Sequence, residues 1–173
     1  VRVQIDLYNN EKDIKLKMRV RTALKDACLK GRTAFGMNVL PQSGGEVVAQ
    51  DYVVTADAER AVSAIHFGTY GLSARENFTL LNSSAYCAHP IDDRVIMMTD
   101  RFGARIDQGE RHFEFELNFS SAESRWGQIE KESQIAHQQP YAISYFPTGN
   151  GKTCGGMIQI SEPSVALTAC RPS

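Results

Sequence analysis

The alternation of apolar and polar residues from His112 to Phe119 constrains the fold of this chain more than any other feature. Every second side chain in this stretch is apolar, and those between are polar or charged; the apolar ones are Phe113, Phe115, Leu117 and Phe119. A period of two is typical of a β-strand that buries one face and exposes the other to water. We therefore expect 112–119 to be a half-buried strand of an antiparallel sheet.

The rest of the chain after Arg94 also has the character of a β-sheet. The polar stretch 120–139 predicts a long loop with one helical turn. Short apolar runs separated by turn residues predict further strands, and these cover 95–98, 103–107, 141–146, 157–161 and 165–169.

The first thirty residues allow two interpretations. Residues 1–8 and 14–21 both alternate, which predicts a hairpin that turns at Asn9-Asn10. Residues 11–30 also carry an apolar stripe at helical spacing, with Asn10 as the N-cap. We favour the long helix.

The region between residues 46 and 81 predicts one strand and two helices. The strand covers 46–54, and a helix follows over 56–67 with Thr55 as its N-cap. A short helix is expected over 73–81. Helices that precede strands predict an α+β fold, with an N-terminal helix or helices packed on an antiparallel β-sheet.

Length and charge limit the possible organisation and partners. With 173 residues, of which 42% are apolar, the chain can bury the core of a single domain over 1–173, with a helix-rich half, 1–81, and a sheet half, 82–173. A net charge of −1 predicts no nucleic-acid partner. No apolar run approaches the roughly 18 residues of a membrane span, so membrane contact is expected only through a helix that precedes Val1.

The four cysteines suggest disulfide bonds. They lack the spacing of a metal site, and an even number of cysteines is typical of an oxidising compartment. Four cysteines allow three connectivities, and reduced, buried thiols in a cytosolic protein are the alternative. We favour the bonds Cys28–Cys87 and Cys154–Cys170, because the two cysteines of the second pair are close in sequence and flanked by turn residues.

Three glycosylation motifs point to the same compartment. The Asn-x-Ser/Thr pattern occurs at Asn77, Asn82 and Asn118, which is more often than the composition leads us to expect. Together with the cysteines, these motifs predict an extracellular, cell-surface or periplasmic location.

Two loops resemble ligand sites but lack the residues that such sites need. The run 148–153 ends like a phosphate-binding loop, but Phe146 stands where the first glycine is required, and a predicted strand follows. We expect neither a cofactor nor a metal. Four potential metal ligands share one loop without the paired spacing of a zinc site, and they are Cys87, His89, Asp92 and Asp93.

The polar face of 112–119 carries the best candidates for acid–base chemistry. His112, Glu114 and Glu116 share that face, so two carboxylates beside an imidazole are conceivable as a catalytic pair. An exposed strand face explains the same residues, and no nucleophile motif accompanies them. His66 and His137 fit packed or exposed positions. We therefore expect the chain not to be an enzyme.

Two parts of the chain resemble pilin-like proteins. The runs KMRVRTALKDACLKG, EVVAQDYVV and ADAERAVSAIHF are similar to the membrane-proximal part of TadE-like proteins. The run YAISYFPTGNGKTCGGMIQIS is similar to the terminal strands of GspH/FimT-like pseudopilins. The resemblance implies a helix packed on an antiparallel sheet, an extracytoplasmic location and no catalysis.

Three functions remain open on these grounds. The first is a non-enzymatic subunit of a surface filament or secretion assembly, whose partners are copies of itself or other assembly proteins. The second is a secreted, disulfide-braced binding module or adhesin. The third is a hydrolase or inhibitor with an unrecognised site at His112, Glu114 and Glu116.

Overall fold

The computed structural model divides the chain into two compact units, 1–137 and 138–173. The first unit is described over 1–10, 17–41, 45–69, 71–74, 78–79, 89–91, 94–96 and 109–137. In the second unit the described residues are 138–140, 142, 144, 146, 149–151, 158–162, 165 and 167, and none of them belongs to a helix or strand. The strands predicted over 141–146, 157–161 and 165–169 are therefore not found at their described positions.

The described residues of the first unit form strands and one helix. A six-stranded antiparallel sheet has the order β1-β12-β7-β6-β3-β4. Its strands are β1 (Arg2–Asn9), β3 (Cys28–Thr33), β4 (Gly36–Val39), β6 (Gln50–Ala56), β7 (Arg60–His66) and β12 (Gly109–Ser121). A four-stranded sheet has the order β2-β9-β8-β5, from β2 (Arg19–Val20), β5 (Glu46–Val48), β8 (Gly71–Ala74) and β9 (Phe78–Thr79). A separate hairpin pairs β10 (His89–Ile91) with β11 (Arg94–Ile96), and the helix is α1 (Ala122–His137).

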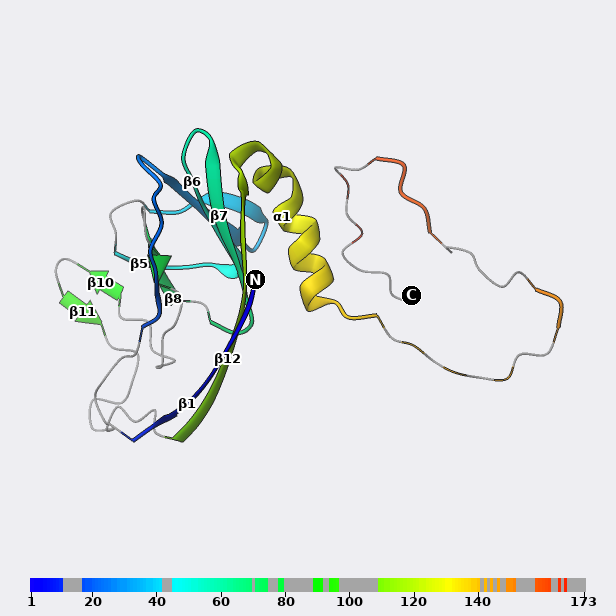
Figure 1. The fold of residues 1–173 in the computed structure, drawn as a ribbon, viewed down its shortest axis with the longest axis horizontal. Coiled ribbons are helices and arrows are strands. Elements are labelled where there is room, and N and C mark those ends of the chain that lie inside the picture. The colour runs from blue at the N-terminus through cyan, green and yellow to red at the C-terminus, as the bar shows by residue number, and fades with distance from the viewer. Residues whose placement is uncertain are drawn as a thin grey trace. The chain divides into compact units, whose positions relative to one another are not determined.

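The long strand predicted from the alternation of residues 112–119 is confirmed. It forms the middle of β12, which pairs with β1 on one side and with β7 on the other, as Figure 1 shows. Phe115 is completely buried, and Phe113 and Leu117 pack against the same core. Phe119 departs from the pattern, because 58% of its surface is exposed.

The predicted α+β class is wrong. In the described part of residues 1–81 there is no helix, and the structure is mostly antiparallel sheet with one helix after the last strand. The helix favoured over 11–30 is replaced at its described positions by β2 and the start of β3. Residues 11–16 lie outside the described residues. The short helix expected over 73–81 is replaced by the end of β8 and by β9.

The helix predicted over 56–67 is the turn and second strand of the β6–β7 hairpin. Both faces of β7 are buried, so apolar residues do not alternate with polar ones, and such a run resembles a buried helix. The turn has its own local signal. The carboxylate of Asp57 accepts hydrogen bonds from the backbone N–H groups of Glu59 (3.0 Å) and Arg60 (2.7 Å), which closes a tight Asx-type turn.

Residues predicted as a polar loop form α1. The hydroxyl of Ser121 accepts a hydrogen bond from the N–H of Ser124 (3.4 Å), which is the contact of an N-cap. The side of α1 that faces the sheet is small and partly polar, and its buried residues are Ala122, Arg125, Ile129 and Ser133.

No helix among the described residues is long and apolar enough to cross a membrane.

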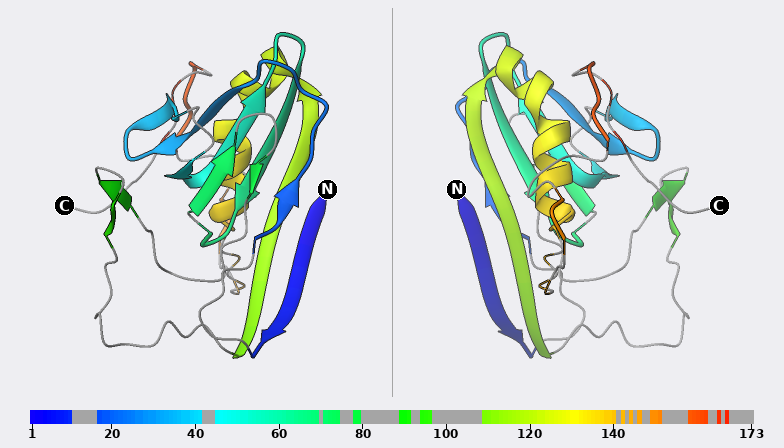
Figure 2. Two further views of the ribbon diagram at one scale, coloured as in Figure 1. Left: turned by 90° about the vertical axis from the view of Figure 1, so that its left-hand side faces the viewer. Right: turned by 90° about the vertical axis from the view of Figure 1, so that its right-hand side faces the viewer.

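The two faces of the six-stranded sheet carry separate cores. One core packs the sheet against the four-stranded sheet and includes Val53, Val62, Ala64, Leu72 and Phe115. The other packs the sheet against α1, which lies along that face in Figure 2, and includes Tyr52, Val54, Ala61, Ile65 and Ile129. Alternate residues of β6 and β7 therefore serve opposite cores.

Gly31 shows how closely the first of these cores is packed. A Cβ at this position would lie 2.7 Å from the Leu40 side chain and 2.9 Å from that of Ala49. Real Cβ atoms do not approach other atoms so closely, so this crossing of strands and loop requires glycine.

Candidate functional site

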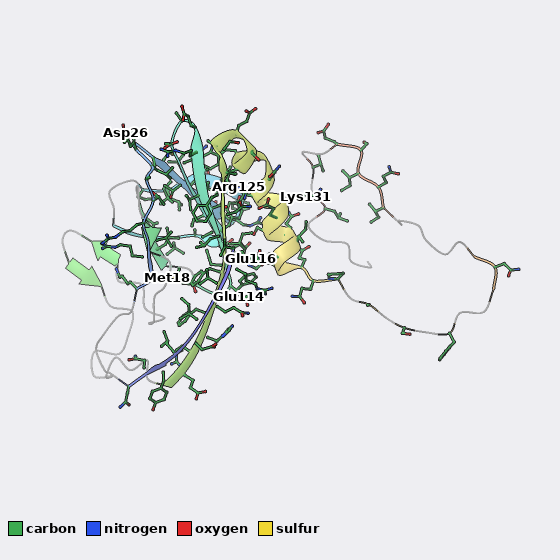
Figure 3. All side chains as sticks on the ribbon, viewed as in Figure 1. Met18, Asp26, Glu114, Glu116, Arg125 and Lys131 are labelled. Carbon is green, nitrogen blue, oxygen red and sulfur yellow. The ribbon has the colours of Figure 1, made fainter. Side chains whose placement is uncertain are left out.

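The sequence-predicted polar residues of β12 lie opposite polar residues of β1. In the register of this pair, Asp6 is opposite His112, Gln4 is opposite Glu114, and Arg2 is opposite Glu116. Directly opposed side chains on one face of an antiparallel pair interact. We call these six residues the β1–β12 ladder. Figure 3 shows Glu114 and Glu116 at successive positions along β12.

The members of this ladder bind one another. His112 Nδ1 lies 2.6 Å from the Asp6 carboxylate. Glu114 pairs with the guanidinium of Arg2 and also accepts a hydrogen bond from the Gln4 amide at 3.5 Å. The structure thus brings His112 and Glu114 to one face, as the sequence predicted, but supplies each with a cross-strand partner that local sequence could not reveal.

A pocket of about 550 Å³ lies at one end of the ladder. Its lining combines acidic, basic and aromatic residues, and the aromatic residue, Tyr8, is 70% exposed. Its volume falls in the range of about 300–1,000 Å³ that is typical of small-molecule sites. We call it the ladder pocket, and its lining residues are Asp6, Leu7, Tyr8, Glu110, Arg111 and His112.

A second pocket, of about 420 Å³, lies where β12 ends and β7 begins. Two arginines and an exposed phenylalanine border it above a floor of apolar side chains. We call it the arginine pocket, and its lining residues are Arg21, Thr22, Ala23, Leu24, Arg60, Ala61, Val62, Phe119 and Ser120. Sequence reasoning missed it because its residues come from three separate segments.

A polar network attaches α1 to the strands. Arg32 of β3 pairs with Glu130 of α1 and with Asp51, whose carboxylate lies 3.1 Å away. The hydroxyl of Tyr52 donates a hydrogen bond to Glu130 at 2.7 Å. Burial raises the pKa of Tyr52, so the phenol stays protonated and remains a donor. These contacts fix the position of the helix on the sheet.

Arg125 is a buried cation beneath the same helix. The residue is completely buried; its guanidinium donates to Glu132 at 2.6 Å and to the hydroxyl of Ser63 at 3.5 Å. Figure 3 shows Arg125 at α1, next to the sheet. A buried guanidinium needs such an acid, because an unpaired charge away from water is strongly unfavourable.

His66 and His137, for which the sequence left packed and exposed positions open, lie close together at the end of β7. The ring of His137 stacks on Phe67 with centroids 4.8 Å apart, and its Nε2 lies 3.1 Å from the carbonyl oxygen of His66. His66 is buried, and burial lowers its pKa to about 4. Its imidazole is therefore neutral at physiological pH.

The remaining predicted sites are placed only in part. Cys28 carries a free thiol, so the bond expected from it to Cys87 is not formed, and Cys87, Cys154 and Cys170 lie outside the described residues. Asn118 is exposed on β12, whereas Asn77 and Asn82 lie outside the described part. Within the described residues, no group of three His, Cys, Asp or Glu side chains could hold a metal ion.

The comparisons with known proteins show a fold but not a family. No protein-family model and no curated sequence matches the chain. Two solved structures are similar: an α-mannosidase from Enterococcus faecalis V583 and a protein of glycosyl hydrolase family 38 from Enterococcus faecalis. In both, the TM-score is 0.58 and the identity 12%, over 78% of this chain and 16% of the other.

This similarity corrects the description that the pilin-like resemblance suggested. The matching structures are chains of glycoside hydrolases, the fold is mostly β, and Cys28 is not in a disulfide bond. The description of a pilin-like α+β filament subunit braced by a Cys28–Cys87 disulfide bond is therefore wrong. The extracellular or periplasmic location stays a prediction.

Proposed function

We propose that this chain is a non-catalytic β-sheet domain that works with the catalytic part of an α-mannosidase-like glycoside hydrolase. The observation that carries the proposal is the fold similarity over 78% of this chain, to a part that makes up 16% of the neighbours' chains. Because a fold alone does not fix a function, the role that we assign to the chain, which is binding, orienting or shielding, is argued below from its surface.

The ladder pocket is the surface that suits this role best. Carboxylates such as Asp6 and Glu110 accept hydrogen bonds from the hydroxyl groups of a sugar, and both lie on the face of the β1–β12 pair that carries Tyr8. The exposed ring of Tyr8 offers an apolar face for the C–H groups of a pyranose, with a hydroxyl at its tip. A few polar groups beside an apolar surface are the usual composition of a small-molecule site.

The contacts of the ladder favour recognition over bond cleavage. Retaining and inverting glycosidases use two carboxyl groups with different protonation states on either side of the scissile bond. Here the carboxylates of Asp6 and Glu114 are each held by a basic partner on the neighbouring strand. Each carboxylate is thus engaged on its own strand pair, and its remaining lone pairs can accept hydrogen bonds from hydroxyl groups, which suits recognition of a sugar.

The proposal is tested by titrating the chain with methyl α-D-mannopyranoside and α-1,2-mannobiose while backbone amide signals are followed by NMR. We expect the largest shifts at β1 and the start of β12. Tyr8→Ala should abolish them, whereas Phe35→Ala, which removes an exposed aromatic ring outside the pocket, should not. The same samples should not hydrolyse 4-nitrophenyl α-D-mannopyranoside.

Two outcomes would contradict the proposal. Hydrolysis of the aryl mannoside by the chain alone would show that it carries its own catalytic groups. The absence of amide shifts with both mannosides, at millimolar concentrations, would remove the carbohydrate-binding role.

A further inference from the structure

We propose that the arginine pocket is a second binding site, which takes a sugar ring that carries an oxyanion, either a phosphate or a carboxylate. The anion would lie between Arg21 and Arg60, and the ring would lie against Phe119. That the ligand contains a sugar ring rests on the proposed carbohydrate function. That it carries an anion rests only on the charge of this pocket.

The walls and floor of the pocket define a place for a ring. Its floor is apolar and buried, with Leu24 at 6% and Val62 at 5% exposure. Phe119 stands beside this floor with 58% of its surface open, although the alternation of β12 places it on the same side as the fully buried Phe115. A large aromatic side chain left open above an apolar floor offers a stacking surface for a ligand.

The charge of the pocket is positive. Both charged residues in its lining are arginines, and no acidic residue is among the described lining residues. Arg21 is exposed and forms no ion pair with the described part of the chain. A guanidinium without an acid partner retains all of its donors for a phosphate or carboxylate.

Arg60 is held in place at the rim of this pocket. Its Nη2 donates to the carboxylate of Asp57 at 3.2 Å and to the carbonyl oxygen of Ala23 at 3.3 Å. Backbone N–H groups of Arg60 and Glu59 hold the pKa of Asp57 below its usual range, so this brace persists in mildly acidic solution. A guanidinium fixed before binding loses less side-chain entropy when an anion arrives.

Hydroxyl-bearing residues also belong to the lining. The Thr22 hydroxyl, next to Arg21 in the chain, accepts from the N–H of Leu24 at 3.5 Å. Ser120 is opposite Ala61 in the β12–β7 register, so its side chain lies on the other face of the sheet from Phe119, and its hydroxyl donates to the carbonyl oxygen of Ser121 at 3.2 Å. Two cations and an aromatic face together match an acidic sugar better than a neutral one.

The test is a calorimetric and NMR titration of the chain at low ionic strength with four probes. These are D-mannose 6-phosphate, D-glucuronate, methyl α-D-mannopyranoside and inorganic phosphate. We expect both acidic sugars to shift the amides of 21–24, 60–62 and 119–120 and to bind more tightly than the neutral sugar. Tighter binding of the first identifies a phosphate site, and tighter binding of the second a carboxylate site.

Variants separate the two parts of the site. Arg21→Gln should weaken binding of the acidic sugars about tenfold, the loss expected for one charge-assisted hydrogen bond. Phe119→Ala should weaken acidic sugars and leave inorganic phosphate unchanged. Arg19→Gln, which removes an exposed guanidinium that lines neither pocket, is the matched control and should leave these affinities unchanged.

Three results would overturn the inference. They are equal binding of acidic and neutral sugars, unchanged affinity in Arg21→Gln, and inorganic phosphate binding as tightly as the sugar phosphate. These results are distinguishable from a failure of the proposed function. That function is tested by the binding of neutral mannosides to the ladder pocket and by the variant Tyr8→Ala. Arg21 and Phe119 are both exposed, and thermal unfolding of each variant verifies that the fold is retained.

Discussion

The two faces of the six-stranded sheet are covered by different means. The face toward the four-stranded sheet packs apolar side chains such as Val53, Val62 and Phe115 against one another. The face toward α1 has an apolar centre as well, but a buried arginine and an ion-paired glutamate of the helix complete it. The first face is stabilised by the burial of apolar surface, which does not require a particular orientation of the side chains. The second face also depends on hydrogen bonds and ion pairs, which require defined distances and angles.

This difference explains what determines the position of the four-stranded sheet on one face and of α1 on the other. Apolar packing tolerates repacking, provided that volume and pattern are kept. A guanidinium such as that of Arg125 or Arg32 must meet its acid at one place, so these pairs determine where the helix lies. The following predictions test this contrast in order of decreasing effect.

The largest effect is expected from Phe115→Ala. Phe115 is completely buried in the core between the sheets, and removal of such a ring leaves a cavity. The free energy of unfolding should fall by about 3–5 kcal/mol, measured by urea denaturation. Phe119→Ala, four residues along the same strand, should change it by less than about 0.5 kcal/mol because that ring is exposed. Equal losses would contradict the assignment of the two rings.

The next effect is a pH dependence from His66. His66 lies opposite Phe115 in the β12–β7 register, and its burial lowers its pKa from 6.5 to about 4. Between these two pH values, His66 is therefore protonated in the unfolded chain but neutral in the folded chain. Stability from this group is complete above pH 6.5 and is lost as pH falls toward 4, by up to roughly 3 kcal/mol.

This dependence is measured by denaturation at several pH values. Asp51 and His137 act on the same imidazole, the first raising and the second lowering its pKa. His66→Gln should remove most of the slope in this range, whereas His137→Gln should keep it. A wild-type curve that is flat between pH 6.5 and 4 would be incompatible with a buried, neutral His66.

A smaller effect is expected on the helix face. Glu132→Gln removes the acid of Arg125, which is completely buried, and should lower the free energy of unfolding by about 1–2 kcal/mol. The loss stays moderate because the Glu132 side chain is 36% exposed and water can reach the pair. Arg125→Met should be within about 1 kcal/mol of wild type, since it removes the buried charge itself. A larger loss in Arg125→Met than in Glu132→Gln would argue against this account.

The smallest effect is expected at the β1–β12 ladder. Arg2→Ala removes the partner of Glu114, but the Arg2 side chain is 57% exposed. Exposed pairs contribute little, so the free energy of unfolding should change by about 0.2–0.5 kcal/mol, and less at high salt. Denaturation at low and high ionic strength measures the difference. A loss comparable to that of Glu132→Gln would place the ladder among the structural contacts.

Sequence patterns predicted the half-buried strand β12 and most of β6, but took β7, which is buried on both faces, for a helix. β12 was predicted because its polar face is open, as the ladder residues show. The β6–β7 hairpin was interpreted as a strand and a helix because β7 is buried on both faces. The helix α1 was interpreted as a loop because its inward side presents Arg125 and Ser133 among its few buried residues.

The candidate site was predicted in the same partial way. His112, Glu114 and Glu116 were recognised as one polar face, since residues two apart on a strand must share a side. Their partners could not be predicted, because Asp6 is 106 residues and Arg2 112 residues away along the chain. No local pattern unites Arg21, Arg60 and Phe119 either.

By itself, the sequence determined which residues of β1 and β12 face water and which face a core, because the period of a strand is a local property of the backbone. Tertiary structure alone decided what lies across from each strand and on which face α1 packs. Strand pairing joins segments by backbone hydrogen bonds that are nearly independent of side-chain identity, so partners are selected by the packing of the whole sheet. Both proposed pockets arise at that level, where distant segments meet at the two ends of β12.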